Sequence, residues 1–239
     1  MVASPENAFA HLRRIGESLV GLLAASDAVV VAEATAGTRD ERDSSSRLLR
    51  SETSFRLRRT IAGRGPESET FTLAARPPPL RYASGQVAIV LVVRDRGGEL
   101  AARDGAGGDR WRAVQGTGAG LVLSDGALSE EVERSLAELW SAARSERSEA
   151  PADALARLLE GAPRKLALMA ALDLADLAHE GRLPESVASE LRTRLADPEL
   201  VPELRPVLEH ALASPGFGEP PPRATAPAVD PRPGPTAGQ

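Results

Sequence analysis

The sequence predicts an α+β fold in which a small antiparallel β-barrel, preceded by one helix, is followed by a short α-helical hairpin array. Apolar residues recur at helical spacing up to residue 25, alternate or run together in short segments between residues 28 and 123, and return to helical spacing from residue 129. Hydrophobic residues make up 42 % of the 239, enough for a core, but aromatic residues only 3 %. Leu, Val and Ala must therefore build most of that core.

Residues 1–27 are expected to form an N-terminal amphipathic helix. Ser4 followed by Pro5 is typical of a helix start, and apolar residues then recur every three or four positions. A pair of arginines ahead of the semi-apolar run 15–25 also imitates a secretory signal, but Glu17 interrupts that run. We therefore expect a cytoplasmic protein, with export as the alternative if this segment is a decayed signal.

Residues 28–127 are expected to form the β-barrel. The predicted strands are short and separated by turn-forming residues; they cover 28–34, 55–61, 70–75, 86–94, 111–115 and 121–123. Because 86–94 is apolar nearly throughout, we expect it to be the central strand. The polar segment 38–46 shows no periodicity and is predicted to be a loop. The prolines at 77–79 predict a stiff connector, and the glycine pair at 97–98 predicts a hairpin turn.

Residues 128–213 are expected to form four or five short antiparallel helices. Pro151 and Pro163 stand where first helical turns would begin, and glycines stand where helices would end. Residues 214–239 are dominated by Pro, Gly and Ala and contain almost no large apolar side chain. We expect this last segment to be a disordered tail, because it cannot offset the entropy of ordering.

The composition excludes several classes of site. The chain has no cysteine, so disulfides, thiolate metal sites and cysteine nucleophiles are excluded. No segment approaches the roughly 20 apolar residues that span a bilayer, so no membrane span is expected. The formal net charge of −5 argues against a general nucleic-acid binder, which usually carries a basic excess.

No catalytic residue and no cofactor are predicted. The glycine run 116–120 lacks the following helix and the lysine of a phosphate-binding loop, so a hairpin is expected there. No serine lies in a Gly-x-Ser-x-Gly motif, and the three histidines are scattered. We therefore expect that the chain is not an enzyme.

Asp173, Asp176 and His179 lie three residues apart along a predicted helix and form a weak candidate metal site. Further ligands are missing, so we reject this set and predict no metal. Asp173 lies on the most apolar predicted helix, where an unpaired carboxylate is unfavourable, and it is expected to pair with an arginine from a neighbouring helix. The candidate partners are Arg157, Arg192 and Arg194.

An arginine-rich segment is the strongest candidate binding surface. Between residues 47 and 64, six arginines stand against the single acidic residue Glu52, a local charge of about +5. They are Arg47, Arg50, Arg56, Arg58, Arg59 and Arg64. Arg56 and Arg58 share the outward face of a predicted strand and, with Trp111, are weak candidates for binding phosphate, an acidic partner or single-stranded nucleic acid. The alternative is a solvated strand face.

Five segments within residues 26–123 carry a resemblance to a known fold: "SDAVVVAEA", "SFRLRRTIAG", "ETFTL", "YASGQVAIVLVV" and "WRAVQGTGAGLVL". In strand order and turn placement, with Gly63 and Gly85 at turns, they resemble the OB-like barrel of uncharacterised bacterial envelope proteins, akin to the netrin and metalloproteinase-inhibitor module. The cysteine-dependent activity of the inhibitor is not implied, since this chain has no cysteine. The resemblance strengthens the alternative of export.

Residues 154–213 resemble two degenerate HEAT-type helical pairs. The resemblance rests on "ALARLLEGAPRKLALMAALDLADLAHEGRLPESVASELRTRLADPELVPELRPVLEHALA". In such arrays stacked helices form a partner-binding face. Two pairs fall short of the three that an independent array needs, so we expect this region to lean on the barrel or on the N-terminal helix.

These patterns predict a non-catalytic protein-interaction or scaffold module whose partner is another protein. The first alternative is an OB-type binder of single-stranded nucleic acid that uses the arginine-rich strand. The second alternative is an enzyme or metal protein centred on Asp173, Asp176 and His179.

Overall fold

The computed structural model describes residues 18–75, 81–95, 110–114, 120–123, 127–145 and 151–213. Several sequence-based expectations lie outside these residues: the helix before residue 18, the connector 77–79, the turn 97–98, most of the glycine run and the tail 214–239.

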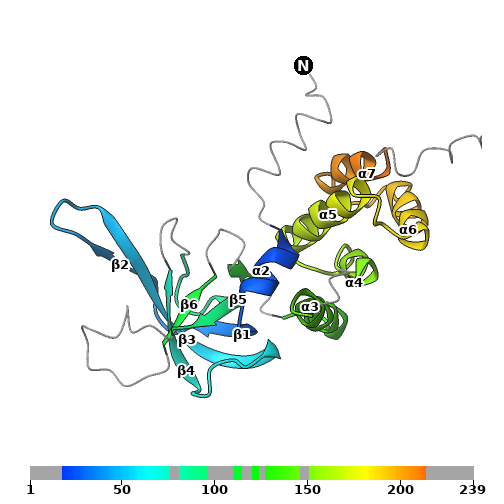
Figure 1. The fold of residues 1–239 in the computed structure, drawn as a ribbon. Coiled ribbons are helices and arrows are strands. Elements are labelled where there is room, and N and C mark those ends of the chain that lie inside the picture. Colours follow the sequence, from blue (N-terminus) through cyan, green and yellow to red (C-terminus); the bar gives the residue numbers. More distant parts are fainter. Residues whose placement is uncertain are drawn as a thin grey trace, which may run out of the picture.

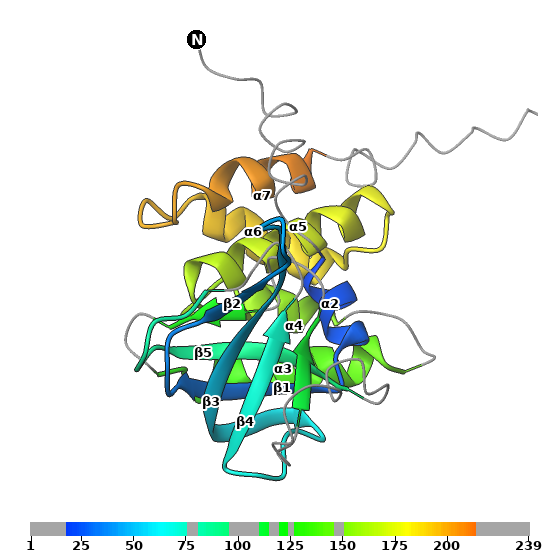
Figure 2. The same ribbon diagram turned by 90° about the vertical axis from the view of Figure 1, so that its left-hand side faces the viewer.

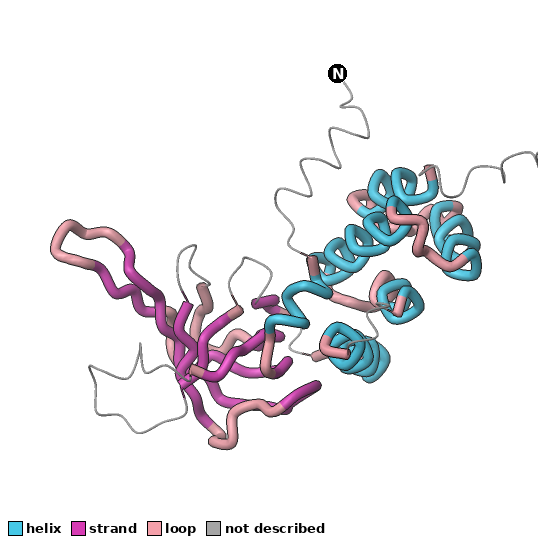
Figure 3. The backbone as a smooth tube through the Cα atoms, in the orientation of Figure 1, coloured by secondary structure: helices cyan, strands magenta, loops and turns pink. Residues whose placement is uncertain are grey.

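The described residues form one sheet and a group of helices (Figure 1). The strands are β1 (Ala28–Ala34), β2 (Arg39–Arg42), β3 (Leu48–Gly63), β4 (Thr70–Ala75), β5 (Val87–Arg94), β6 (Arg110–Ala113) and β7 (Gly120–Val122). The helices are α2 (Leu19–Ala25), α3 (Glu130–Ala143), α4 (Ala152–Arg157), α5 (Arg164–His179), α6 (Glu185–Leu195) and α7 (Leu204–Leu212). Strands and the later helices occupy opposite sides, with α2 at their junction (Figure 3). The α+β class is confirmed.

All seven strands belong to one mixed sheet. β1 pairs with β3 and β5, β3 with β4, β4 with β6, and β6 with β5, so five strands form a circuit of neighbours. β2 and β7 attach outside this circuit, to β3 and β5. The sheet is loosely barrel-like and compatible with an OB-like fold, but it does not close into a regular barrel. The expected purely antiparallel pairing is wrong, because a circuit with an odd number of strands cannot alternate in direction throughout. The parallel pair of this circuit is β4 with β6.

The segment 38–46 is not a loop, contrary to the prediction. It contains β2, which pairs antiparallel with the start of β3, from Arg39 opposite Glu52 to Arg42 opposite Leu48. β2 has no apolar periodicity because none of its residues is buried. The β2–β3 hairpin that results projects away from the helices (Figure 1).

β1 and β5 are buried on both faces. On one face, Val30 and Val90 pack with Phe55, Phe71 and Trp111 in the interior of the barrel-like sheet. The opposite face packs against the helices, in one cluster with the buried side chains of α2, α3 and α5. Its members on these two strands are Val29, Val31, Val87, Ile89 and Leu91. β5 also pairs with three other strands, so the expectation of a central strand is confirmed.

The helical region follows the expected starts and stops. Ser129 begins α3 by accepting a hydrogen bond from the Val132 N–H at 3.3 Å, and Pro151 and Pro163 directly precede α4 and α5. α5 is central, with eleven of its 16 residues buried. α6 and α7 lie at the end remote from β4 (Figure 2). None of the helices in the described ranges is long and apolar enough to cross a membrane.

Gly63 marks a close approach of β3, the start of β1 and α3. Its φ of +79° lies in the left-handed region. A Cβ added here would lie 2.2 Å from the backbone oxygen of Asp27 and 2.8 Å from Cζ2 of Trp140, so both conformation and space exclude a side chain. Gly85 provides a comparison, because its φ is +82° but an added Cβ would meet nothing within 4 Å.

We expect Gly63→Ala to lower the free energy of unfolding by about 3 kcal/mol or more, since left-handed strain adds to a backbone clash. Gly85→Ala should lower the free energy of unfolding by about 1 kcal/mol, because the left-handed backbone is strained there but the new side chain meets no neighbour. Urea denaturation followed by circular dichroism measures both losses. Equal losses in the two variants would contradict the close packing at Gly63.

Candidate functional site

The arginine-rich segment lies on β3, and its two candidate side chains are exposed but paired. The Arg56 and Arg58 side chains are 56 % and 45 % exposed. Arg56 Nε lies 3.8 Å from Oε1 of Glu69, and Arg58 Nη2 donates to Oε2 of Glu33 at 3.0 Å. Each of the two cations expected to meet a ligand therefore already lies beside a carboxylate.

Two further arginines of the segment are also in ion pairs. Arg50 pairs with both Glu41 and Glu52, with its Nη2 3.1 Å from Oε1 of Glu52. Arg59 reaches Glu133 on α3. Together with the ion pairs of Glu33 and Glu69, these contacts place five glutamates beside four of the six arginines. Four of the five glutamates lie outside residues 47–64, so a charge count along that segment could not include them.

Trp111 is not an exposed stacking side chain. It is 3 % exposed and packs in the interior of the sheet with Phe55 and Phe71. β4 also separates its strand, β6, from β3. The structure therefore does not bring Trp111 to one surface with Arg56 and Arg58.

Asp173 is buried, but the prediction that it pairs with an arginine is wrong. Its Oδ2 accepts a hydrogen bond from the backbone N–H of Val20 at 2.8 Å, at the start of α2. Burial raises the pKa of Asp173 to about 6, and hydrogen bonds from Val20, Ser18 and Leu19 oppose that rise only in part. The N–H groups at a helix start need an acceptor, and the carboxylate supplies one without burying a guanidinium. The expected arginines pair elsewhere: Arg157 with Glu138, Arg192 with Glu185, and Arg194 with Glu160 and Glu190.

Asp176 and His179 do not assemble a metal site with Asp173. The carboxylate of Asp173 is directed to α2, and His179 is exposed at the end of α5. No group of three or more His, Asp or Glu residues that could hold a metal ion occurs in the described ranges.

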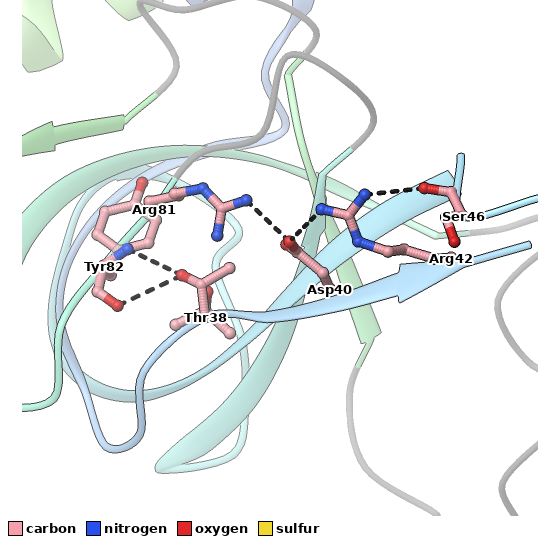
Figure 4. Close-up of polar contacts among 7 residues, drawn as sticks. Thr38, Asp40, Arg42, Ser46, Arg81 and Tyr82 are labelled. Atoms are coloured by element: carbon pink, nitrogen blue, oxygen red, sulfur yellow. Dashed lines mark hydrogen bonds and ion pairs between the residues drawn. The ribbon is translucent and has the colours of Figure 1, made fainter. Parts of the chain in front are cut away.

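The β2–β3 hairpin is an ordered surface feature that the sequence analysis missed (Figure 4). At its base, the Tyr82 N–H donates to Thr38 Oγ1 at 2.8 Å, and the Thr38 N–H donates to the Tyr82 carbonyl at 3.0 Å. Asp40 accepts hydrogen bonds from Arg81 Nη2 at 2.8 Å and from Arg42 Nη2 at 3.4 Å. The hydrogen bond from Arg81 is the main cause that lowers the pKa of Asp40. These contacts tie the hairpin to the segment before β5 and fix its direction.

Asp43 holds the turn of the hairpin. Its Oδ1 accepts hydrogen bonds from the N–H and hydroxyl of Ser45 and from the N–H of Arg47, all at 2.8 to 2.9 Å. The Ser45 hydroxyl contributes most to lowering the pKa of Asp43. Ser46 has a φ of +65°, and its carbonyl accepts a hydrogen bond from Arg42 Nη1 at 2.9 Å. Side-chain hydrogen bonds, rather than a glycine, therefore specify this turn.

Two side chains beside the turn are exposed and contribute little to the core. Leu49 is 45 % exposed, and the exposed Arg47 side chain makes no ion pair with any described residue. The hairpin contains no histidine or cysteine, so it offers no imidazole or thiol. The signal in the sequence was the turn chemistry of Asp43 followed by three serines.

The buried Asp173 makes stability depend on pH. Folding raises the pKa of this carboxyl from 3.8 to about 6, so in that range the folded chain keeps a proton that the unfolded chain has lost. The stabilisation is fully present below about pH 4 and is lost as the pH rises through about 6, by roughly 3 kcal/mol in total.

We therefore expect Asp173→Asn to gain roughly 3 kcal/mol in stability relative to the native chain between about pH 4 and about pH 8. Chemical denaturation of both chains at each pH measures this difference. A difference that stays constant with pH would contradict the burial of a titrating carboxyl at this position.

The comparisons with known proteins assign no family to the chain: no protein-family model matches it, and no curated protein is significantly similar to it in sequence.

Proposed function

We propose that this chain is a non-catalytic interaction module or scaffold that binds another protein through the β2–β3 hairpin. The observation that carries this proposal is a projecting hairpin whose base and turn are both fixed by side-chain hydrogen bonds. A surface that is already ordered loses little conformational entropy on binding. These polar contacts therefore order a part of the molecule that contributes little to the core.

The hairpin supports contact through side chains at its turn rather than the addition of a strand. The edge strand β2 is made of charged residues, and charged edges resist pairing with a foreign strand. Leu49 offers apolar surface next to the cation of Arg47. This pair fits a protein surface with an apolar depression and an acidic rim.

The rest of the fold supports a scaffold role. The circuit of five strands supports the proposed kinship of the sheet with OB-like barrels, akin to the netrin and metalloproteinase-inhibitor module. The packing of α5 and of α6 on α7 supports the proposed HEAT-type pairing. We propose that the β-barrel part ends at residue 127 and that the helical part begins at residue 128. A shared apolar cluster joins the two parts.

Replacement of both Leu49 and Arg47 by serine should remove partner binding. The matched control is Val122→Ser, because Leu49 and Val122 are the large hydrophobic side chains exposed in the described ranges and Val122 lies on β7. We expect proteins captured from native lysate by the full chain and by the control to fall at least about tenfold with the hairpin variant, a loss of about 1.4 kcal/mol. Quantitative mass spectrometry measures the capture, and equal melting temperatures confirm folding. Equal capture by all three chains would refute the hairpin as the binding element.

The alternative function, binding of single-stranded nucleic acid, has weaker support because Arg56 and Arg58 are paired and Trp111 is buried. We expect no binding of a single-stranded oligonucleotide tighter than about 10 µM at physiological salt. Fluorescence anisotropy of the full chain and of the Arg56→Glu, Arg58→Glu variant tests this. Tighter binding that weakens with salt and is lost in the variant would promote the alternative.

A further inference from the structure

A cavity of about 370 Å³ lies between the sheet and α3. It occupies the opposite end of β1 from the hairpin: Asp27 precedes β1 and Gly63 ends β3, whereas the hairpin follows the end of β1. The volume falls within the range of about 300 to 1,000 Å³ that is usual for small-molecule sites. The cavity plays no part in the proposed function of the hairpin.

Both tryptophans of the chain line this cavity. Trp140 is held in place, since its Nε1 donates to the Ser26 carbonyl at 3.3 Å and the Arg144 guanidinium lies 5.0 Å from its ring centre. Arg144 Nη1 donates to the same carbonyl at 2.7 Å. A flat aromatic surface and a cation are therefore fixed beside each other before any ligand binds.

The second tryptophan forms part of the cavity wall. Trp111 is 3 % exposed, and its Nε1 is buried without a hydrogen-bond acceptor among the described residues. Because water does not reach this N–H, it does not open onto the cavity. Trp111 therefore contributes apolar ring surface to the wall, not a hydrogen-bond donor.

The charges around the cavity favour an anion. Arg64, Arg94 and Arg144 line it against the two carboxylates of Asp27 and Glu67. Asp27 Oδ2 is already engaged, because it accepts the backbone N–H of Arg94 at 2.9 Å. The Arg64 side chain makes no ion pair with any described residue, so it can meet an anionic group.

We propose that this cavity binds a small carboxylate that carries an aromatic ring. The ring packs against Trp140, and the carboxylate meets the cations of Arg64 and Arg144. This site is separate from the hairpin, so its failure would leave the proposed protein-binding function standing.

Intrinsic tryptophan fluorescence of the full chain reports on this site alone, because both tryptophans line it. We expect phenylacetate to change the emission saturably, with a dissociation constant of about 1 mM or tighter. Acetate lacks the ring and 2-phenylethanol lacks the charge, so each should bind at least about tenfold more weakly.

Arg64→Gln should weaken phenylacetate binding about tenfold without changing the melting temperature, since this side chain makes no ion pair within the described ranges. The matched control, Arg134→Gln, removes an exposed charge from α3 outside the cavity and should leave binding unchanged. No response to phenylacetate up to about 10 mM would overturn the proposal. Equal binding of 2-phenylethanol, or unchanged affinity in the Arg64→Gln variant, would overturn it as well.

Discussion

β1 and β5 pair with each other and are buried on both faces, so the barrel-like interior and the helical layer are built on the same two backbones. Side chains at even positions of β1, such as Val30, fill the sheet, and those at odd positions, such as Val31, pack against helices. A shift of one residue in either strand would exchange these two sets and disrupt both layers at once. The register of this pair therefore positions everything attached to it, including the hairpin and the cavity.

Elements with strong local signals could be predicted from the sequence. β1, β4 and β5 are apolar segments bounded by turn residues, and α3 and α5 begin at Ser129 and after Pro163, as the capping and proline signals indicate. β2 could not be predicted in this way, because both its faces are exposed and only its backbone pairing with β3 makes it a strand. The parallel pairing of β4 with β6 is likewise a property of the whole sheet and leaves no local pattern.

The interaction partners of the charged side chains in the candidate sites could not be predicted from the sequence either. Six arginines in one segment indicated a basic surface, but their glutamate partners come from β1, β2, the residue before β4 and α3. Asp173 was correctly expected to be buried and partnered, yet its partner is a backbone N–H of α2, far away in the chain. Spacing along a helix shows which side chains share a face, but not which distant backbone group they meet.

Trp140 on α3 and Arg144, the residue that follows α3, both donate to the same backbone oxygen, that of Ser26 between α2 and β1. Because this acceptor belongs to the main chain, every residue type at position 26 would provide it, whereas few residue types can donate as these two do. Position 26 is constrained for a different reason: its side chain is buried, and its hydroxyl donates to the Leu23 carbonyl at 2.8 Å. The hydrogen bonds to its carbonyl place a separate constraint on the side chains at positions 140 and 144.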